Sequence, residues 1–86
     1  MANENVIEAF LSRQPAGNGA LFTLDGKLVS YQLPIANYGK AGIRVLAKTR
    51  CVKPDGSVSR TTLKHRGILL RAAEMRGIVV DEVDSL

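Results

Sequence analysis

Hydrophobic and polar positions alternate along residues 43–52, which read IRVLAKTRCV. A period of two is typical of a β-strand that buries one of its faces. The apolar set of this predicted strand comprises Ile43, Val45, Ala47 and Cys51. The other set contains three cations, Arg44, Lys48 and Arg50, together with Leu46 and Val52. We therefore expect three positive charges on the uncovered face of a sheet.

The same alternation predicts two strands earlier in the chain, over residues 20–24 and 27–38. They flank Asp25-Gly26, a dipeptide strongly favoured in two-residue hairpin turns. Alternate positions of the second strand are expected to form one core face and one uncovered face. The core face would hold Val29, Tyr31, Leu33 and Ile35, and the uncovered face Ser30, Gln32 and Pro34. A short strand over residues 58–61 is a further candidate.

Apolar residues recur at helical spacing near the start of the chain, over residues 3–14, where Asn3 or Asn5 can serve as the N-cap. The apolar stripe of this predicted helix comprises Val6, Ile7, Phe10 and Leu11.

A second helix is predicted over residues 61–77, with Thr61 or Thr62 as its cap and Gly77 at its end. His65 falls on the side of this helix that faces the core, so we expect it to be a hydrogen-bonded structural residue. The apolar arc comprises Ile68, Leu69, Ala72, Ala73 and Met75.

These elements predict a single α+β domain with an N-terminal helix, a three- to four-stranded antiparallel meander, and a C-terminal helix packed on one sheet face. Both helices are expected on the same face. The expected divisions are a helix and linker over 1–17, the sheet over 18–61, a helix over 62–77 and an acidic tail over 78–86. The apolar run 78–80 is expected to dock as a short strand or against the core.

Composition narrows the classes of function. The chain is 86 residues long, 45% apolar and 23% charged, which is typical of a globular domain. No apolar run approaches the roughly 20 residues that span a bilayer, and the polar N-terminus does not resemble a signal peptide, so we expect a cytoplasmic protein without membrane contact. One histidine and one cysteine cannot form a zinc site within one chain, and no nucleophile–base–acid set is visible. We therefore expect no enzyme activity, no cofactor and no metal.

Positive charge is concentrated in one region. Residues 43–76 carry nine cations against two anions, whereas the last ten residues carry three anions and no cation. Such a region is typical of a surface that binds a polyanion. Proteins that read DNA with a sheet use basic and small polar side chains on a free face, so the sequence favours duplex DNA as the partner. The candidate contact residues are Arg44, Lys48, Arg50, Arg60, Lys64 and Arg66.

The start of the second helix is a second candidate anion site, because cations crowd a turn where the helix dipole disfavours them. Free backbone N–H groups, two threonine hydroxyls and the side chains of residues 64–66 would together suit a phosphate. A solubilising basic surface is the competing interpretation of all these cations. The absence of acids between residues 43 and 52, and the apolar Leu46 and Val52 among the cations, favour a contact surface.

The strings GNGALFTLDGKLVSYQLPIA and SVSRTTLKH resemble a family of small uncharacterised phage and prophage proteins. The shared pattern is ALF-x-x-DG-x-L-x-SY-x-x-x-IA followed by TT-x-x-H, and it covers residues 18–66. The resemblance implies a viral origin, hence the cytoplasm of a host cell, and no particular chemistry. It leaves open an alternative function, a phage effector that binds and modulates a host protein, and it leaves open a homodimer.

Overall fold

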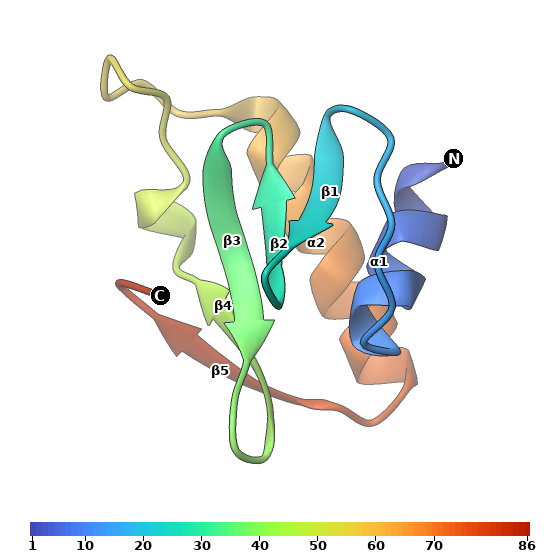
Figure 1. Cartoon of the computed structure of the whole chain (residues 1–86). Coiled ribbons are helices and arrows are strands. Elements are labelled where there is room, and N and C mark those ends of the chain that lie inside the picture. The colour runs from blue at the N-terminus through green and yellow to red at the C-terminus, as the bar shows by residue number, and fades with distance from the viewer.

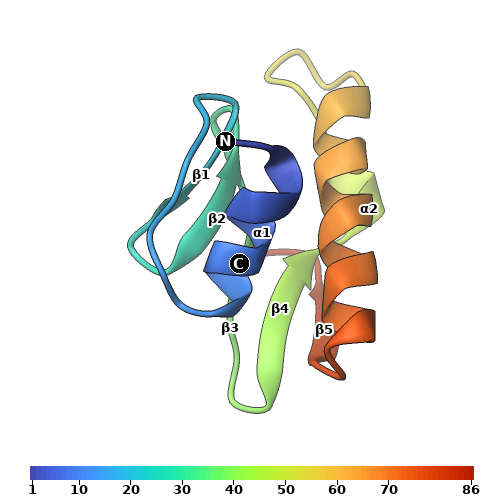
Figure 2. The ribbon, with the colours of Figure 1, turned by 90° about the vertical axis from the view of Figure 1, so that its right-hand side faces the viewer.

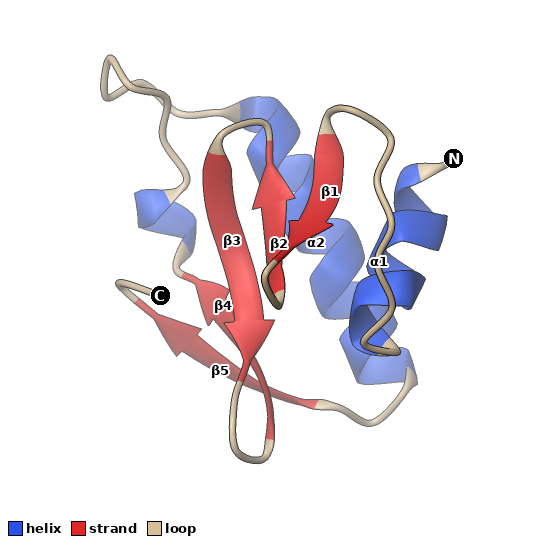
Figure 3. Ribbon diagram, viewed as in Figure 1, coloured by secondary structure: helices blue, strands red, loops and turns tan.

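Two helices pack on one side of a five-stranded β-sheet in the computed structural model, which describes residues 1–86 (Figures 1 and 3). In Figure 1 α2 lies behind β1 and β2 and α1 lies to the right of β1, and the rotated view of Figure 2 shows the two helices side by side. The elements are α1 (Asn3–Leu11), β1 (Leu21–Leu24), β2 (Lys27–Ser30), β3 (Leu33–Tyr38), β4 (Gly42–Leu46), a 3-10 turn (Lys48–Arg50), α2 (Arg60–Met75) and β5 (Val79–Val83).

The strands lie in the order β1-β2-β3-β4-β5. The first four form the expected antiparallel meander, but β5 pairs with β4 in parallel, so the sheet is mixed and has five strands. A parallel pair needs a long crossover connection, and α2 supplies it. Gly77, at a φ of 67°, reverses the chain after α2, and the apolar residues that follow bring it to the sheet edge. The α+β class is confirmed, whereas the purely antiparallel sheet is wrong.

The predicted strand over residues 27–38 is two strands joined by a two-residue turn at Tyr31 and Gln32. Tyr31 has a φ of 58°, a value usually taken by glycine in such turns, and its N–H donates to the carbonyl of Ala20 at 2.7 Å. Tyr31 is 51% exposed in this turn, whereas the alternation predicts that it lies in the core. It also places Ser30 on the helix side of the sheet rather than on the uncovered side.

The strand predicted through residue 52 ends at Leu46. The N–H of Ala47 donates to the carbonyl of Val83 at 2.7 Å, which is the last bond of the β4–β5 ladder, and the chain then enters the 3-10 turn. Lys48 and Arg50 therefore do not continue the row begun by Arg44. Leu46 is buried rather than exposed among cations, while Cys51 is buried as expected. Residues 58–61 contribute only an isolated bridge between Val52 and Val58 before α2 begins.

The core lies between the sheet and the two helices. Phe10 of α1 stacks on Tyr38 of β3 with ring centroids 4.9 Å apart, and the Tyr38 hydroxyl donates to the Phe10 carbonyl at 2.7 Å. Leu69 and Ala73 face the core as predicted, but Met75 is 82% exposed, because it lies on the side of α2 away from these two residues. The buried cluster comprises Val6, Ile7, Phe10, Leu21, Leu28, Ile35, Ala36, Ile43, Val45, Leu69 and Ala73.

The predicted caps differ from the observed ones. Ala2 precedes α1 without a side-chain hydrogen bond, so neither Asn3 nor Asn5 caps that helix. Ser59 caps α2 and accepts from the N–H of Thr62. Both threonines suggested as caps lie inside the first turn, because the helix begins two residues earlier than the apolar pattern indicated.

Leu69 and Met75 provide a matched test of this packing, because both belong to the apolar arc that the sequence predicts. Leu69→Ala should lower the free energy of unfolding by about 2–4 kcal/mol, since it leaves a cavity in a fully buried site. Met75→Ala should change it by less than about 0.5 kcal/mol. Urea denaturation of both variants measures the difference, and equal losses would contradict this packing of α2.

Gly42 lies where β4 and β5 approach closely, and a Cβ atom at this position would clash with the carbonyl of Val79. Gly42→Ala should therefore destabilise the fold by about 1–3 kcal/mol, by forcing the two strands apart. Gly67→Ala is the control, because Gly67 is helical and a Cβ there meets no atom within 4 Å. The control should stabilise the protein by roughly 0.5–1 kcal/mol. Thermal or urea unfolding of the two variants measures these changes in stability. A Gly42→Ala variant as stable as the native protein would contradict the β4–β5 pairing.

Candidate functional site

All of the net positive charge of the chain comes from one segment. Residues 48–64 hold five cations and one anion, or +4, and the remaining residues hold seven cations and seven anions, or zero. We call residues 48–64 the basic segment. It runs from the 3-10 turn through the loop at the upper left of Figure 1 to the start of α2. Its cations, all exposed, are Lys48, Arg50, Lys53, Arg60 and Lys64.

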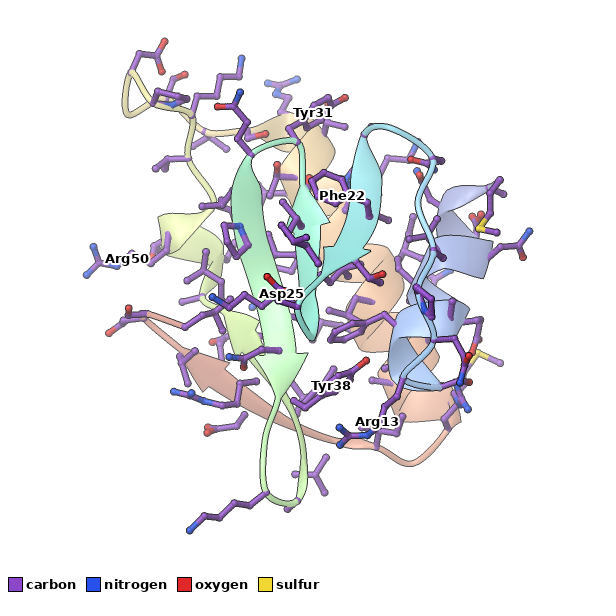
Figure 4. All side chains as sticks on the ribbon, in the orientation of Figure 1. Arg13, Phe22, Asp25, Tyr31, Tyr38 and Arg50 are labelled. Atoms are coloured by element: carbon purple, nitrogen blue, oxygen red, sulfur yellow. The ribbon has the colours of Figure 1, made fainter.

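None of these five cations forms an ion pair within the protein. The two ion pairs of the structure join Arg66 to Glu82 and Arg76 to Glu8. Arg13 lies over the ring of Tyr38, 3.9 Å from its centroid. The cations outside the basic segment thus include several that the fold itself uses, whereas those inside it are free to meet a ligand; Arg50 points away from the body of the molecule (Figure 4).

The single acid of the basic segment, Asp55, is turned toward its own loop. Its carboxylate accepts hydrogen bonds from the N–H of Ser57 at 2.9 Å and from the Ser57 hydroxyl at 2.6 Å. These hydrogen bonds lower the pKa of Asp55, so the group is ionised at neutral pH. The charge of the segment at neutral pH is therefore the +4 counted from the sequence.

A pocket of about 740 Å³ opens beside the start of α2. Its walls are the β2–β3 turn at residues 31–32, the loop at 52–54, and Ser59, Thr61 and Thr62 of the helix start. Figure 4 places Tyr31 at this end of the molecule. The pocket therefore brings hydroxyl groups and the Lys53 side chain together at the positive end of a helix dipole.

A chain of buried hydroxyl groups forms the base of this pocket. Ser59 Oγ donates to Thr62 Oγ1 at 2.9 Å, Thr62 Oγ1 lies 3.0 Å from Ser30 Oγ, and Ser30 Oγ lies 2.7 Å from His65 Nδ1. Either Thr62 or Ser30 can donate in the bond between their hydroxyl groups, and Nδ1 of a neutral His65 can meet Ser30 Oγ either as acceptor or as donor, depending on the tautomer.

His65 is 1% exposed, and burial, assisted by the charge of Lys64, lowers its pKa below the ordinary 6.5. Its buried environment and the neighbouring positive charge thus favour the neutral ring. The expectation of a hydrogen-bonded structural histidine is confirmed. The network fixes the helix start against the β2–β3 turn, and so holds two walls of the pocket together.

The six predicted contact residues do not share one surface. Lys48, Arg50, Arg60 and Lys64 belong to the basic segment, and Arg44 lies on the uncovered sheet face opposite Asn37 and Asp81. Arg66 is buried: its Nε donates to the Leu46 carbonyl at 2.8 Å, and its guanidinium pairs with Glu82. Arg66 cannot reach an external phosphate without giving up both partners.

The basic sheet face expected from the sequence is therefore wrong. Ser30 lies beneath α2, and Gln32 lies in a turn. The face away from the helices carries a row of mixed charge, with Lys27, Asn37, Arg44 and Asp81 in register across four strands. Beside this row lie Phe22, labelled on the near face in Figure 4, its β2 partner Val29, and Pro34, the β3 partner of Val29. The cations gather instead at one end of the molecule.

Sequence reasoning missed Ser59, Tyr31 and Lys53 as parts of the pocket. Ser59 has a usable sequence signal, because a serine before a helical stretch is a favoured N-cap. The predicted strand over residues 58–61 includes it and so hides that signal. Tyr31 had none, since no glycine or asparagine marks its turn. Lys53 becomes part of the pocket only because its loop folds toward α2.

Comparison of the chain with family models, with curated proteins and with solved structures finds no significant match. No helix in the structure combines the length and apolar character that crossing a membrane requires. No three histidine, cysteine or acidic side chains come together as a potential metal site.

The lowered pKa of His65 makes stability depend on pH. The folded state favours the neutral ring, while the unfolded chain binds a proton at about the ordinary pKa of 6.5. The stabilisation is therefore present above pH 6.5 and is lost as pH falls below it. Urea unfolding at about pH 7.5 and about pH 5.5 should show this loss in the native protein, and His65→Asn, which keeps an acceptor but does not titrate, should show a smaller one. An unchanged pH dependence in the variant would contradict this assignment.

Proposed function

We propose that this protein binds nucleic acid, with duplex DNA as the preferred form, through the basic segment at residues 48–64. The observation that carries the proposal is that this one segment, whose cations are all exposed, accounts for the whole net charge of +4. A polyanion would be attracted to this end of the molecule and would find no comparable excess of positive charge elsewhere.

The start of α2 gives the segment a specific place for a phosphate. The first N–H groups of a helix have no partner within it, and their dipoles favour an anion. Ser59 satisfies the N–H of Thr62, which leaves the earlier N–H groups of the turn for a ligand. The exposed Thr61 adds a hydroxyl group, and Lys53, Arg60 and Lys64 add positive charge around the same turn.

Duplex DNA is preferred over a single strand because single-strand binders stack successive bases on several aromatic side chains. Tyr31 is the one aromatic residue that lines the pocket. Phosphate contacts carry most of the affinity for a duplex and need only cations and N–H groups. A Tyr31→Ala variant should therefore bind duplex DNA nearly as well as the native protein.

Charge reversal at the helix start tests the proposal. The variant Lys53→Glu, Arg60→Glu, Lys64→Glu should bind a random-sequence duplex at least about tenfold more weakly than the native protein, as measured by fluorescence anisotropy at low salt. Its slope of log affinity against log salt should be shallower by about 0.9 for each phosphate that the variant no longer neutralises. Circular dichroism and thermal unfolding confirm that the variant remains folded.

The matched control reverses three exposed cations outside the segment, Lys27→Glu, Lys40→Glu and Arg71→Glu, and gives the same net charge. A local site predicts a much smaller loss of affinity in this control. Equal losses in the two variants would show that only the total charge matters and would contradict a site. Absence of salt-dependent binding by the native protein would overturn nucleic-acid binding altogether.

A further inference from the structure

The two edges of the sheet differ in how their backbone groups are used. Along β1, the preceding segment closes the edge: Gly17 forms a bridge with Phe22, and Thr23 N–H donates to the Ala16 carbonyl at 2.9 Å. Asn18 N–H also donates to the Leu21 carbonyl at 2.9 Å. This edge therefore cannot accept another strand without displacing residues 16–18.

The β5 edge is open. Its only strand neighbour is β4, and no ribbon runs along its outer side in Figure 1. The Val83 carbonyl accepts from Ala47 and so points toward β4. Backbone groups of successive residues in a strand point in opposite directions, so the N–H and C=O groups of Val80 and Glu82 point outward. These are obligatory hydrogen-bonding groups that another strand could satisfy.

The side chains along this edge define which strand would fit. Asp81, Glu82 and Asp84 are exposed, and the next exposed residue along the edge is the β-branched Val79, at 57%. A second copy of β5 would bring like charges together; centred on Asp81, an antiparallel pair would set this residue opposite itself, which is destabilising. A strand that alternates cations with β-branched residues would instead place opposite charge beside these acids.

We propose that β5 accepts an extended lysine- or arginine-rich segment of a partner protein as a sixth strand. The backbone groups of Val80 and Glu82 bind the main chain of the partner segment, which is the general mode of recognition by strand addition. Asp81, on the uncovered face, and Asp84 select for its cations. Glu82 contributes its backbone, while its side chain remains paired with Arg66.

The probe is a short synthetic peptide of alternating lysine and valine, added to the full chain and followed by NMR. The amide protons of Val80 and Glu82 should show the largest shift changes and should exchange with solvent several-fold more slowly when the peptide is bound. A glutamate–valine peptide of equal length should leave both unchanged. Shifts confined to other strands, or equal binding of the acidic peptide, would overturn the proposal.

Asp81→Lys tests the effect of charge, with Glu74→Lys as the control because Glu74 is an exposed acid on α2 and gives the same net charge. The first variant should weaken binding of the lysine–valine peptide several-fold more than the second. Equal weakening would show attraction to total charge rather than to this edge. Sedimentation of the free native chain as a β5-paired dimer would also overturn the proposal, since the edge would then serve self-association.

Discussion

The burial of the Arg66 guanidinium is the constraint on which the arrangement of β4, β5 and α2 depends. A charge removed from water costs several kcal/mol unless it is paired and fully hydrogen-bonded. The Leu46 carbonyl meets its Nε at the end of β4, and Glu82 of β5 meets the guanidinium. Both strands must therefore be in place beside α2 for this charge to be satisfied. The ion pair between Arg66 and Glu82 therefore stabilises the C-terminal segment as a strand parallel to β4 rather than as an unpaired tail.

The burial of Arg66 also determines which cations are accessible to a ligand. Arg66 and Lys64 are two residues apart, yet one is held inside the protein and the other faces solvent. Arg60 lies in the first turn of α2, where a positive charge costs a few tenths of a kcal/mol against the helix dipole. The Ser59 cap and the hydroxyl chain to His65 offset that cost by holding the turn in place.

Much of the fold follows from local patterns. Asp25-Gly26 forms the hairpin turn with positive φ at both residues, and the stripe of α1 and most of the arc of α2 meet the core as predicted. The errors arise where tertiary contacts outweigh alternation. The turn at Tyr31 is held by a hydrogen bond to Ala20, the residue opposite it in the β1–β2 hairpin, and alternation within a single strand does not report such a cross-strand contact. The end of β4 is set by β5, which joins only after α2 has crossed over. The alternation of apolar and polar residues over 43–52 carries no information about that later strand.

The acidic C-terminal end lies close to one part of the basic segment, because Arg50 and Asp84 line the same pocket. The sequence predicts an acidic tail over residues 78–86, and acids near a cationic region oppose the approach of a polyanion. In the structure, Asp81 and Glu82 are part of β5, and Glu82 neutralises the buried Arg66. Removing residues 81–86 would leave a buried charge unpaired and would loosen β5, so a change in affinity would report unfolding as well as repulsion. Asp84 lies beyond β5 and is in neither ion pair, so Asp84→Asn isolates the electrostatic effect that truncation cannot.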